Sequence, residues 1–450
     1  MQDQLSAVVL AAGLGTRMRS RLPKMLHPVG GRPMVERVMD ACAAAGVTRL
    51  IAVLSPAQPD VARHLEGRCE IVFQHQQRGT GHAVMQVPDV LLQEGDVLVV
   101  NGDQPLLRGE TVSRLVGRHR ETGAAATLAT VRDAGRPDGR VIRGADGSFL
   151  KIVEHRDATP EERACDEINV GLYCFRGADL SLALSRLTSS NAQGEYYLTD
   201  VFNDLRPVEV VTIEDRTEAL GINDRVQLAQ AEAALRGRVL ERLMREGVTV
   251  VDPATTYVEP QVRVGADTVL EPMTMLRGET VVGDGCRIGP GADIADSVIG
   301  DGVTITHSHL RGARMAEGSD CGPFAKLRAG ADIGPGVHIG SFGEIVRSRL
   351  GRGTKMGHFS YLGDATVGED VNIGAGTISA NFDGRDKNPT VIGRGAFIGC
   401  DSVLIAPVTI GEGAATGAGA IVNHDVPPGS LAVGMPARAI RRRRAETPAE

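Results

Sequence analysis

The residues near the start of the chain that are best suited to chemistry form one glycine-rich stretch. The sequence LAAGLGTRMRSRLPK, residues 10–24, follows an apolar run and combines Gly13 and Gly15 with the cations Arg17 and Lys24. Backbone N–H groups of such a loop can bind phosphate oxygens, while the two cations neutralise their charge. The stretch therefore predicts a polyphosphate-binding loop at the end of a β-strand.

Two common phosphate-binding loops do not match this stretch. A P-loop needs Gly-Lys followed by Ser or Thr, whereas Gly15 is followed by Thr16 and Arg17. A dinucleotide-binding loop needs a third glycine where Met18 stands, and an acid near the end of the second strand, where the sequence has Ser55. The residues therefore argue against both an ATPase loop and a dinucleotide loop.

An α/β fold is predicted to position this loop. Residues 1–220 alternate short, β-branched runs with segments of helical periodicity such as 34–45, which predicts a largely parallel sheet. Ligands of such sheets bind beyond the carboxyl ends of the strands, where the loop at 13–15 and the turn NGDQPL at 101–106 lie. The carboxylate of Asp103 in that turn could hold Mg²⁺.

The second half of the chain has a different period. One helical pattern covers residues 224–246, and apolar residues then recur every six positions. The longest uninterrupted run is Ile392, Ile398, Leu404, Ile410, Thr416 and Val422. This repeat predicts a parallel β-helix, in which each step of six residues forms one face of a prism. A narrow axis excludes bulky rings, which agrees with the absence of Trp.

Composition excludes several classes of protein. The net charge of -7 argues against general nucleic-acid binding, and no window has the 18 or more apolar residues of a membrane-spanning helix. Seven cysteines without CxxC spacing fit reduced thiols in a cytoplasmic protein better than disulfides or zinc. The run RRRR at 441–444 is either a solvated tail or a contact for an anionic ligand.

Several motifs together resemble a known family. LAAGxGTRM followed by LPK resembles the sugar-nucleotidyltransferases, as do FQHQQRGTGHA, NGDQPL, GRVI, IVEH, EINVGLY and GINDRVQL. NAQGEYYLTD at 191–200 and the repeats narrow the match. Over nearly its full length the chain resembles the bacterial bifunctional N-acetylglucosamine-1-phosphate uridyltransferase/glucosamine-1-phosphate acetyltransferases.

The resemblance implies a fold, a domain order and an assembly. An α/β Rossmann-like nucleotidyltransferase domain is expected over 1–223, a connector helix over 224–247 and a left-handed parallel β-helix over 248–437, followed by a basic tail over 438–450. The family's members are homotrimers that supply UDP-N-acetylglucosamine for cell-wall and lipopolysaccharide synthesis. No nucleic acid or membrane partner is implied.

The first implied reaction joins UTP to N-acetylglucosamine 1-phosphate and releases pyrophosphate, with Mg²⁺ as cofactor. Arg17 and Lys24 are expected to act on the phosphates, and Asp103 and Asn223 to bind the metal. The implied contacts to UTP and UDP-sugar are Leu10, Ala11, Gly13, Gly15, Gln74, Gly79, Thr80, Asp103, Gly139, Glu154, Asn169 and Asn223.

The second implied reaction transfers acetyl from acetyl-CoA to glucosamine 1-phosphate. The amine must lose a proton, and His358 in KMGHFSYLGD is the expected base. The implied contacts to glucosamine phosphate are Arg328, Arg347, Tyr361, Asn372 and Lys387. Those to acetyl-CoA are Ala375, Asn381, Phe382, Cys400 and Ala418.

Several positions depart from the family's pattern, among them Ser341 and Phe382, where the family usually has Asn and Tyr. Val346 stands where the family usually has Lys, which could shift the cationic role to Arg347. Leu14 stands where the family often has Lys, so the opening loop has one cation fewer.

Other hypotheses remain open on the sequence. The protein could perform nucleotidyl transfer only, with the β-helix as a trimerisation scaffold. Alternatively, the β-helix could bind zinc as hexapeptide carbonic anhydrases do. The histidines available for that role are His307, His309, His338 and His358. A non-catalytic complex subunit is disfavoured because Arg17 and Lys24 are retained.

Overall fold

The computed structural model describes residues 4–442. The chain folds into two compact units that divide between Leu235 and Arg236. The division falls inside the long helix α8, Arg225–Arg245, which lies within the helical pattern predicted for 224–246. Among the helices of residues 4–442, none is both long enough and apolar enough to cross a bilayer.

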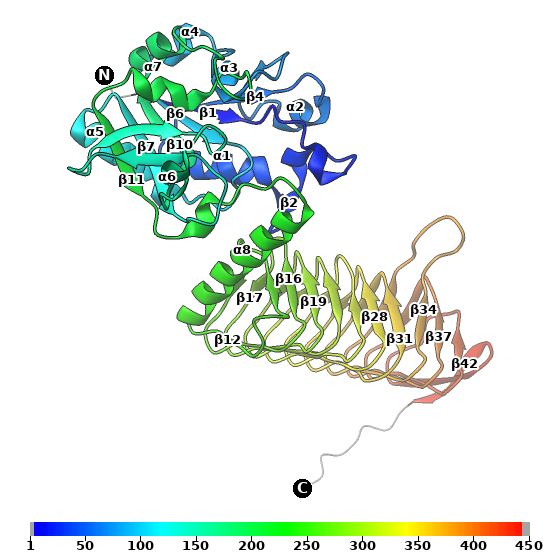
Figure 1. Ribbon diagram of the computed structural model, residues 1–450. Helices are drawn as coiled ribbons and strands as arrows, with labels where there is room; N and C mark the ends of the chain where they lie inside the picture. The colour runs from blue at the N-terminus through cyan, green and yellow to red at the C-terminus, as the bar shows by residue number, and fades with distance from the viewer. Residues whose placement is uncertain (1–3, 443–450) are drawn as a thin grey trace. The chain divides into compact units, whose positions relative to one another are not determined.

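The first unit is built on a mixed nine-stranded sheet with the order β11-β7-β10-β6-β1-β4-β5, and with β8 and β9 attached to β10 (Figure 1). Its strands are β1 Leu5–Leu10, β4 Arg49–Leu54, β5 Glu70–Phe73, β6 Asp96–Asn101, β7 Ala126–Arg132, β8 Arg140–Arg143, β9 Phe149–Val153, β10 Glu167–Arg176 and β11 Val208–Thr212. A short hairpin comprises β2 Pro28–Val29 and β3 Arg32–Pro33. The helices are α1 Met34–Ala44, α2 Pro59–Leu65, α3 Thr80–Val84, α4 Asp89–Gln93, α5 Gly109–Thr122, α6 Pro160–Arg163 and α7 Gly177–Leu184. The 3₁₀ helices are η1 Thr16–Met18, η2 Lys24–Leu26, η3 Leu198–Asn203 and η4 Arg216–Ala219.

Strand direction agrees with the predicted parallel sheet around β1 and at β11, but the pairings of β10 and the β8–β9 pair are antiparallel. Strands β4 and β6 run parallel to β1, β5 runs parallel to β4, and β11 runs parallel to β7. Strand β10 runs antiparallel to both β6 and β7. The predicted α/β sheet is therefore confirmed, and its parallel part carries the loop at 13–15.

The alternating side chains of β1 explain why this strand is central. Leu5, Ala7 and Val9 belong to the core shared with α1 and α5, whereas Val8 belongs to the core shared with α3, α4 and α7. A strand buried on both faces needs an unbroken apolar run, and LSAVVL supplies one. Helices on both faces therefore hold β1 and the loop that follows it.

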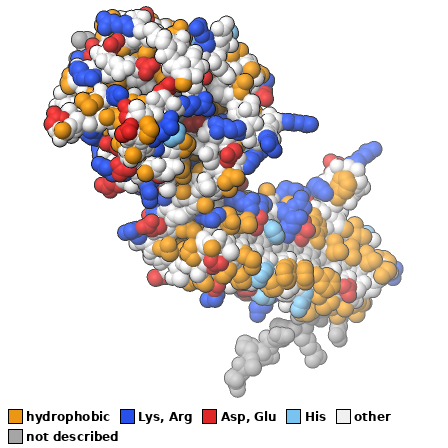
Figure 2. All heavy atoms as spheres, in the orientation of Figure 1, with side chains coloured by type: hydrophobic (Ala, Val, Ile, Leu, Met, Phe, Trp, Pro, Cys, Tyr) orange, Lys and Arg blue, Asp and Glu red, His pale blue; other side chains and the backbone are white. Residues whose placement is uncertain are grey.

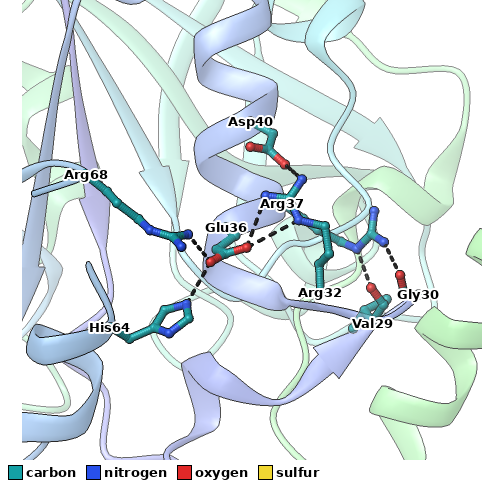
Figure 3. Close-up of polar contacts among 8 residues, drawn as sticks. All are labelled: Val29, Gly30, Arg32, Glu36, Arg37, Asp40, His64 and Arg68. Atoms are coloured by element: carbon teal, nitrogen blue, oxygen red, sulfur yellow. Dashed lines mark hydrogen bonds and ion pairs between the residues drawn. The ribbon is translucent and has the colours of Figure 1, made fainter. Parts of the chain in front are cut away.

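A buried carboxylate in α1 anchors the segment beyond the loop (Figure 3). Glu36 accepts hydrogen bonds from Arg32 Nη2 at 3.1 Å and from Arg68 Nη1, and its Oε1 lies 2.7 Å from His64 Nε2. Burial alone would raise the pKa of Glu36, but hydrogen bonds from His64 and Arg32 and the charge of Arg68 lower it below its ordinary value. The carboxylate thus joins α1, α2 and the β2–β3 hairpin.

The same hairpin is held through its backbone. Arg37 Nη2 donates to the Gly30 carbonyl at 2.7 Å, and Arg37 Nε donates to the carbonyl of Val29. The Gly30 N–H donates to Glu232 Oε2, also at 2.7 Å. Side chains from α1 and α8 thus fix the chain a few residues after Lys24.

The second unit is a left-handed parallel β-helix whose three faces are sheets of twelve, ten and nine strands (Figure 1). The first face comprises β12 Thr249–Val250, β15 Val269–Leu270, β18 Arg287–Ile288, β21 Thr304–Ile305, β24 Asp320–Cys321, β27 His338–Ile339, β30 Lys355–Met356, β33 Asn372–Ile373, β36 Phe397–Ile398, β39 Ala415–Thr416, β41 Ser430–Gly434 and β42 Ala437–Arg442. The second comprises β13 Tyr257–Val258, β16 Met275–Arg277, β19 Asp293–Ala295, β22 His309–Arg311, β25 Lys326–Leu327, β28 Gly343–Val346, β31 Ser360–Gly363, β34 Ile378–Ala380, β37 Val403–Ile405 and β40 Ile421–Val422. The third comprises β14 Arg263–Val264, β17 Val281–Val282, β20 Val298–Ile299, β23 Arg314–Met315, β26 Asp332–Ile333, β29 Arg349–Leu350, β32 Ala365–Val367, β35 Thr390–Ile392 and β38 Val408–Ile410.

The interior of this prism is formed by the six-residue repeat. One stack runs through Leu310, Leu327, Ile345 and Leu362, all fully buried and paired in register between successive coils. Coils also approach closely at the corners. A Cβ added at Gly340 would lie 1.9 Å from the carbonyl oxygen of Gly357, so only glycine fits there.

Two features interrupt the regular coils. Residues 381–389 form a loop between β34 and β35, pinned by an antiparallel bridge between Phe382 and Lys387 and visible as an extended protrusion in Figure 1. The antiparallel pair β41–β42 ends the prism. The predicted tail over 438–450 therefore begins inside β42, and the predicted arginine run continues beyond the described residues at 443 and 444.

Candidate functional sites

A cavity of about 580 Å³ lies at the carboxyl ends of the central strands of the first unit. Leu10 and Asn101, the last residues of β1 and β6, both line it, as the parallel sheet predicts. The predicted residues that line it are Leu10, Arg17, Thr80, Asp103, Gly139, Glu154, Asn169 and Asn223. Residues predicted from distant parts of the sequence, between Leu10 and Asn223, therefore line the same cavity.

Three predicted side chains converge at one end of this cavity. Lys24 Nζ lies 2.6 Å from Asp103 Oδ2 and 2.9 Å from Asn223 Oδ1. The Lys24 side chain is only 7% exposed. Gly15, with a φ of 62°, permits this course, because a Cβ there would lie 2.4 Å from Lys24 Cβ. The glycine of the opening loop thus makes room for its lysine.

The oxygen atoms around the Lys24 ammonium can be compared with the ligands that Mg²⁺ prefers. A carboxylate oxygen and an amide oxygen both reach one small positive centre, the Lys24 ammonium. Mg²⁺ prefers oxygen ligands and is usually held by one or two protein groups, with water and phosphate completing the shell. Asp103 and Asn223 therefore form a donor set that fits the cation.

Side-chain amides tie down the loop itself. Gln77 Nε2 donates to the Ala12 carbonyl at 2.6 Å, and Gln58 Nε2 donates to the carbonyls of Gly13 and Leu14 at 3.4 Å. The predicted contacts Ala11, Gly13 and Gly15 belong to this loop but are not among the residues that line the cavity.

The side-chain amide of Gln74 contacts other groups of the protein. Its Nε2 lies 3.1 Å from both the Gly79 carbonyl and His82 Nδ1. Burial, and next the charge of Arg78, lower the pKa of His82, which favours a neutral imidazole beside this amide. The hydrogen bond from Gln74 to the Gly79 carbonyl therefore holds the backbone next to Thr80, and Thr80 does line the cavity.

A second set of polar groups lies at the other end of the cavity. Glu154 Oε1 accepts from Thr199 Oγ1 at 2.9 Å. Burial raises the pKa of Glu154, and the charges of Asp200, Asp138 and Asp157 raise it further against the hydrogen bond from Thr199. The carboxyl oxygens of Glu154 can accept hydrogen bonds from sugar hydroxyls.

Asn169 completes this end. Its Nδ2 donates to Tyr173 Oη at 2.6 Å, and its Oδ1 accepts from the Gly171 N–H at 3.2 Å. Gly139 leaves room opposite, because a Cβ there would lie 3.4 Å from Glu154 Oε2. Sequence reasoning missed several lining residues, namely Asn101, Gln104, Arg136, Asp138, Tyr173 and Thr199. Asn101, Gln104, Tyr173 and Thr199 fall inside motifs quoted above, whereas Arg136 and Asp138 do not.

In the β-helix, the predicted acetyl-transfer residues lie on one corner. Successive coils pair Lys355 with Asn372, then with Phe397 and Ala415. A second line of residues consists of those that lie three positions after each of these paired residues in the sequence. That line is His358, Ala375, Cys400 and Ala418. The structure therefore aligns the expected base with three expected acetyl-CoA contacts, and His358 is exposed.

Other predicted residues of this unit lie along the adjoining face. Glu344 pairs in register with Tyr361, and Arg328 Nη1 lies 3.0 Å from Glu344 Oε1. On the loop at 381–389, Lys387 Nζ lies 4.2 Å from the centroid of the Phe382 ring. Asn372 lies on the first face, in β33.

Val346 and Arg347, the two residues at the departure from the family's pattern, differ in burial. Val346 is 4% exposed, whereas Arg347 is exposed and forms a bidentate pair with Asp364, at 2.7 and 2.8 Å. Asn381 Nδ2 also donates to Asp364, at 2.5 Å. The hydrogen bond from Arg347 is the main cause that lowers the pKa of Asp364. Arg347 is thus held at this corner by a carboxylate.

The histidines considered for zinc binding have other neighbours. His338 Nδ1 lies 2.7 Å from Asp320 Oδ2, and His309 Nδ1 lies 3.5 Å from Asp293 Oδ2. The His307 ring lies 5.7 Å from that of Phe324. Across residues 4–442, three or more His, Cys, Asp or Glu side chains nowhere cluster in a way that could hold a metal ion.

Known protein families match a segment in each of the two units. Residues 7–247 match the MobA-like NTP transferase domain, and residues 389–424 match six bacterial transferase hexapeptide repeats. A protein named Bifunctional protein GlmU from Carboxydothermus hydrogenoformans is 48% identical over 95% of this chain and 97% of its own length. The chain belongs to the GlmU family. Proteins of the same name from Brevibacillus brevis and Synechococcus elongatus are each 46% identical, over 96% and 95% of this chain and 95% and 96% of their own lengths.

Proposed function

We propose that this GlmU-family chain makes UDP-N-acetylglucosamine in two consecutive reactions. Acetyl transfer from acetyl-CoA to glucosamine 1-phosphate takes place on the β-helix. Uridylyl transfer from UTP to the resulting N-acetylglucosamine 1-phosphate takes place in the cavity of the first unit. The observation that carries the proposal is the convergence of Lys24, Asp103 and Asn223 in a cavity whose other end holds Glu154 and Asn169.

In the uridylyl step, this chain's residues bind and orient two anions. Arg17 and Lys24 neutralise charge on the triphosphate, while Glu154 and Asn169 hold the sugar. The 1-phosphate oxygen then attacks the α-phosphorus in line, the bond to the β-phosphate oxygen breaks, and pyrophosphate leaves. Mg²⁺ held by Asp103 and Asn223 would supply further neutralisation of phosphate charge. No covalent intermediate on the protein is required.

In the acetyl step, His358 removes a proton from the attacking amine. The amine nitrogen bonds to the thioester carbonyl carbon, the carbon–sulfur bond breaks, and coenzyme A leaves as the thiol after protonation. Tyr361, Asn372, Arg328, Arg347 and Lys387 are proposed to bind the sugar phosphate, the cations through its charge. Ala375, Asn381, Phe382, Cys400 and Ala418 are proposed to contact acetyl-CoA.

A direct experiment separates this proposal from a nucleotidyltransferase with a scaffold. Acetyl-CoA consumption should depend on glucosamine 1-phosphate in the wild type and should be lost in His358→Ala. The matched control is His338→Ala, which removes another half-exposed histidine of the β-helix. A wild type without this consumption would leave only uridylyl transfer.

We further propose that three copies associate through the β-helix. Phe324, Phe342 and Phe359 occupy equivalent corner positions on successive coils and are 55%, 62% and 58% exposed. The first two stack with centroids 5.4 Å apart. Figure 2 shows hydrophobic side chains gathered over this unit, and large exposed apolar patches typically mark interfaces. Sedimentation velocity should give a trimer for the wild type and smaller species for Phe342→Asp; an unchanged species would remove Phe342 from the interface.

A further inference from the structure

One cation of the first cavity is not explained by the roles given so far. Arg136 lines the cavity, and with Arg17 it is one of the two cationic side chains among the lining residues. Its Nη2 donates to the Ala219 carbonyl at 2.9 Å, and its Nε lies 2.7 Å from Asp138 Oδ2. Its Nη1 is buried and has no hydrogen-bond partner within residues 4–442. Such an unpaired charged donor is destabilising, so it points to an acceptor that a ligand supplies.

The loop that carries Arg136 is fixed rather than adaptable. Arg140 is 2% exposed and donates from Nη1 to the carbonyls of Arg136 and Asp138, both at 2.9 Å. Its Nε donates to the Arg163 carbonyl at 3.2 Å. A buried guanidinium thus holds the backbone on both sides of Pro137, and the position of Arg136 is built into the fold.

Arg136 connects the two ends of the cavity. On one side, its partner Asp138 precedes Gly139, where a Cβ would lie 3.4 Å from Glu154 Oε2. On the other, Ala219 lies two residues before Gly221, where a Cβ would lie 3.7 Å from Asp103 Oδ1. The guanidinium therefore contacts a segment next to the group proposed to hold the sugar and a segment next to the group proposed to face the phosphates.

The substrate itself has one anionic group at this junction. A sugar 1-phosphate must place its ring at the Glu154 end and its phosphate toward the α-phosphorus of UTP. The cavity wall also contains the carboxylates of Asp103 and Asp138, which would repel a phosphate without a compensating cation. Resting on the proposed function, we propose that Arg136 binds the 1-phosphate of the sugar substrate through its guanidinium group.

Steady-state kinetics in the forward direction tests this assignment. Arg136→Ala should raise the KM for N-acetylglucosamine 1-phosphate by about tenfold or more, because a charge-assisted hydrogen bond is lost. The KM for UTP should change by less than about twofold, since this contact is made only to the sugar substrate. Arg136→Lys should recover part of the loss by restoring the charge. Arg114→Ala is the matched control, because Arg114 also donates to a backbone carbonyl, that of Thr212 at 3.2 Å, but does not line the cavity.

Two results would overturn the assignment. Equal rises in KM for both substrates would indicate a general distortion of the cavity, and an unchanged KM for the sugar phosphate would show that no contact exists. Acetyl transfer on the same preparation should be unaffected, which reports on folding of the β-helix, while an unchanged KM for UTP reports on folding of the first unit. If Arg136→Ala does not fold, Arg136→Lys and Arg136→Gln provide the same comparison. Absence of uridylyl transfer in the wild type would instead refute the proposed function.

Discussion

At the scale of single residues, Lys24 has the most defined role in the uridylyl step. Its ammonium lies 2.6 Å from Asp103 Oδ2, and we propose that it neutralises charge on the triphosphate. Lys24→Ala should lower kcat/KM for uridylyl transfer by about 100-fold or more, as the loss of one aligned charge typically does. Acetyl transfer should remain unchanged.

Lys151→Ala is the matched control for this prediction. Lys151 also forms an ion pair, 2.8 Å from Glu162 Oε1, but is not among the residues that line the cavity. Initial rates with varied UTP would measure both variants. A Lys24→Ala protein with wild-type uridylyl kinetics would contradict the role of this ammonium.

The function of the opening loop could be predicted from its residue types, whereas the place of Arg136 in the cavity could not be predicted from the sequence. Gly15, Arg17 and Lys24 are close in the chain, so their joint chemistry is visible as one motif. The position of Arg136 depends on contacts with Ala219 and on the carbonyl network of Arg140. Such contacts between distant segments leave no local pattern.

At the scale of elements, the Glu36 carboxylate ties α1, α2 and the β2–β3 hairpin together. Because its pKa is lowered in the folded state, it stabilises the fold above its unfolded value of 4.5 and loses this effect as the pH falls below that value. Glu36→Gln should therefore destabilise the first unit by about 1–3 kcal/mol at neutral pH.

Calorimetry at pH 7 and pH 4 would measure this dependence. The difference in melting temperature between wild type and Glu36→Gln should be larger at pH 7 than at pH 4. A difference that grows on acidification would contradict the direction of the pKa shift. Asp60→Asn, which breaks an exposed pair with Arg63, is the control with a small effect at both values.

In the β-helix, stability depends on the interior stack. Ile345 is fully buried between Leu327 and Leu362 in neighbouring coils. Ile345→Ala should destabilise this unit by about 2–5 kcal/mol, because it removes buried methyl groups and leaves a cavity. Arg349→Ala, on the exposed side of β29, should have little effect. Urea unfolding followed by loss of acetyltransferase activity would compare them; equal midpoints for the two variants would contradict the stack's importance.

The six-residue period predicted this unit because each repeat satisfies the same local geometry. The antiparallel direction of β10 was not predicted, because strand direction depends on pairing with β6 and β7, which lie far away in the sequence. The predicted start of the tail at residue 438 was wrong for a similar reason, since β42 is formed by pairing with β41.

At the scale of the whole molecule, one chain combines two compact units with separate sets of candidate residues. The first unit has a cavity lined by Asp103, Asn223, Glu154 and Asn169, and the second aligns His358 with the proposed acetyl-CoA contacts along one corner. Changes to one set should therefore leave the other reaction intact. The order of the two reactions requires an acetylated sugar phosphate as the intermediate.

The most direct test supplies glucosamine 1-phosphate, UTP, Mg²⁺ and radiolabelled acetyl-CoA to purified wild type and to two variants. Wild type should form labelled UDP-N-acetylglucosamine, Lys24→Ala should accumulate labelled N-acetylglucosamine 1-phosphate, and His358→Ala should form neither product. Unlabelled nucleotide sugar from the wild type, or labelled product from His358→Ala at the wild-type rate, would contradict the two-site account.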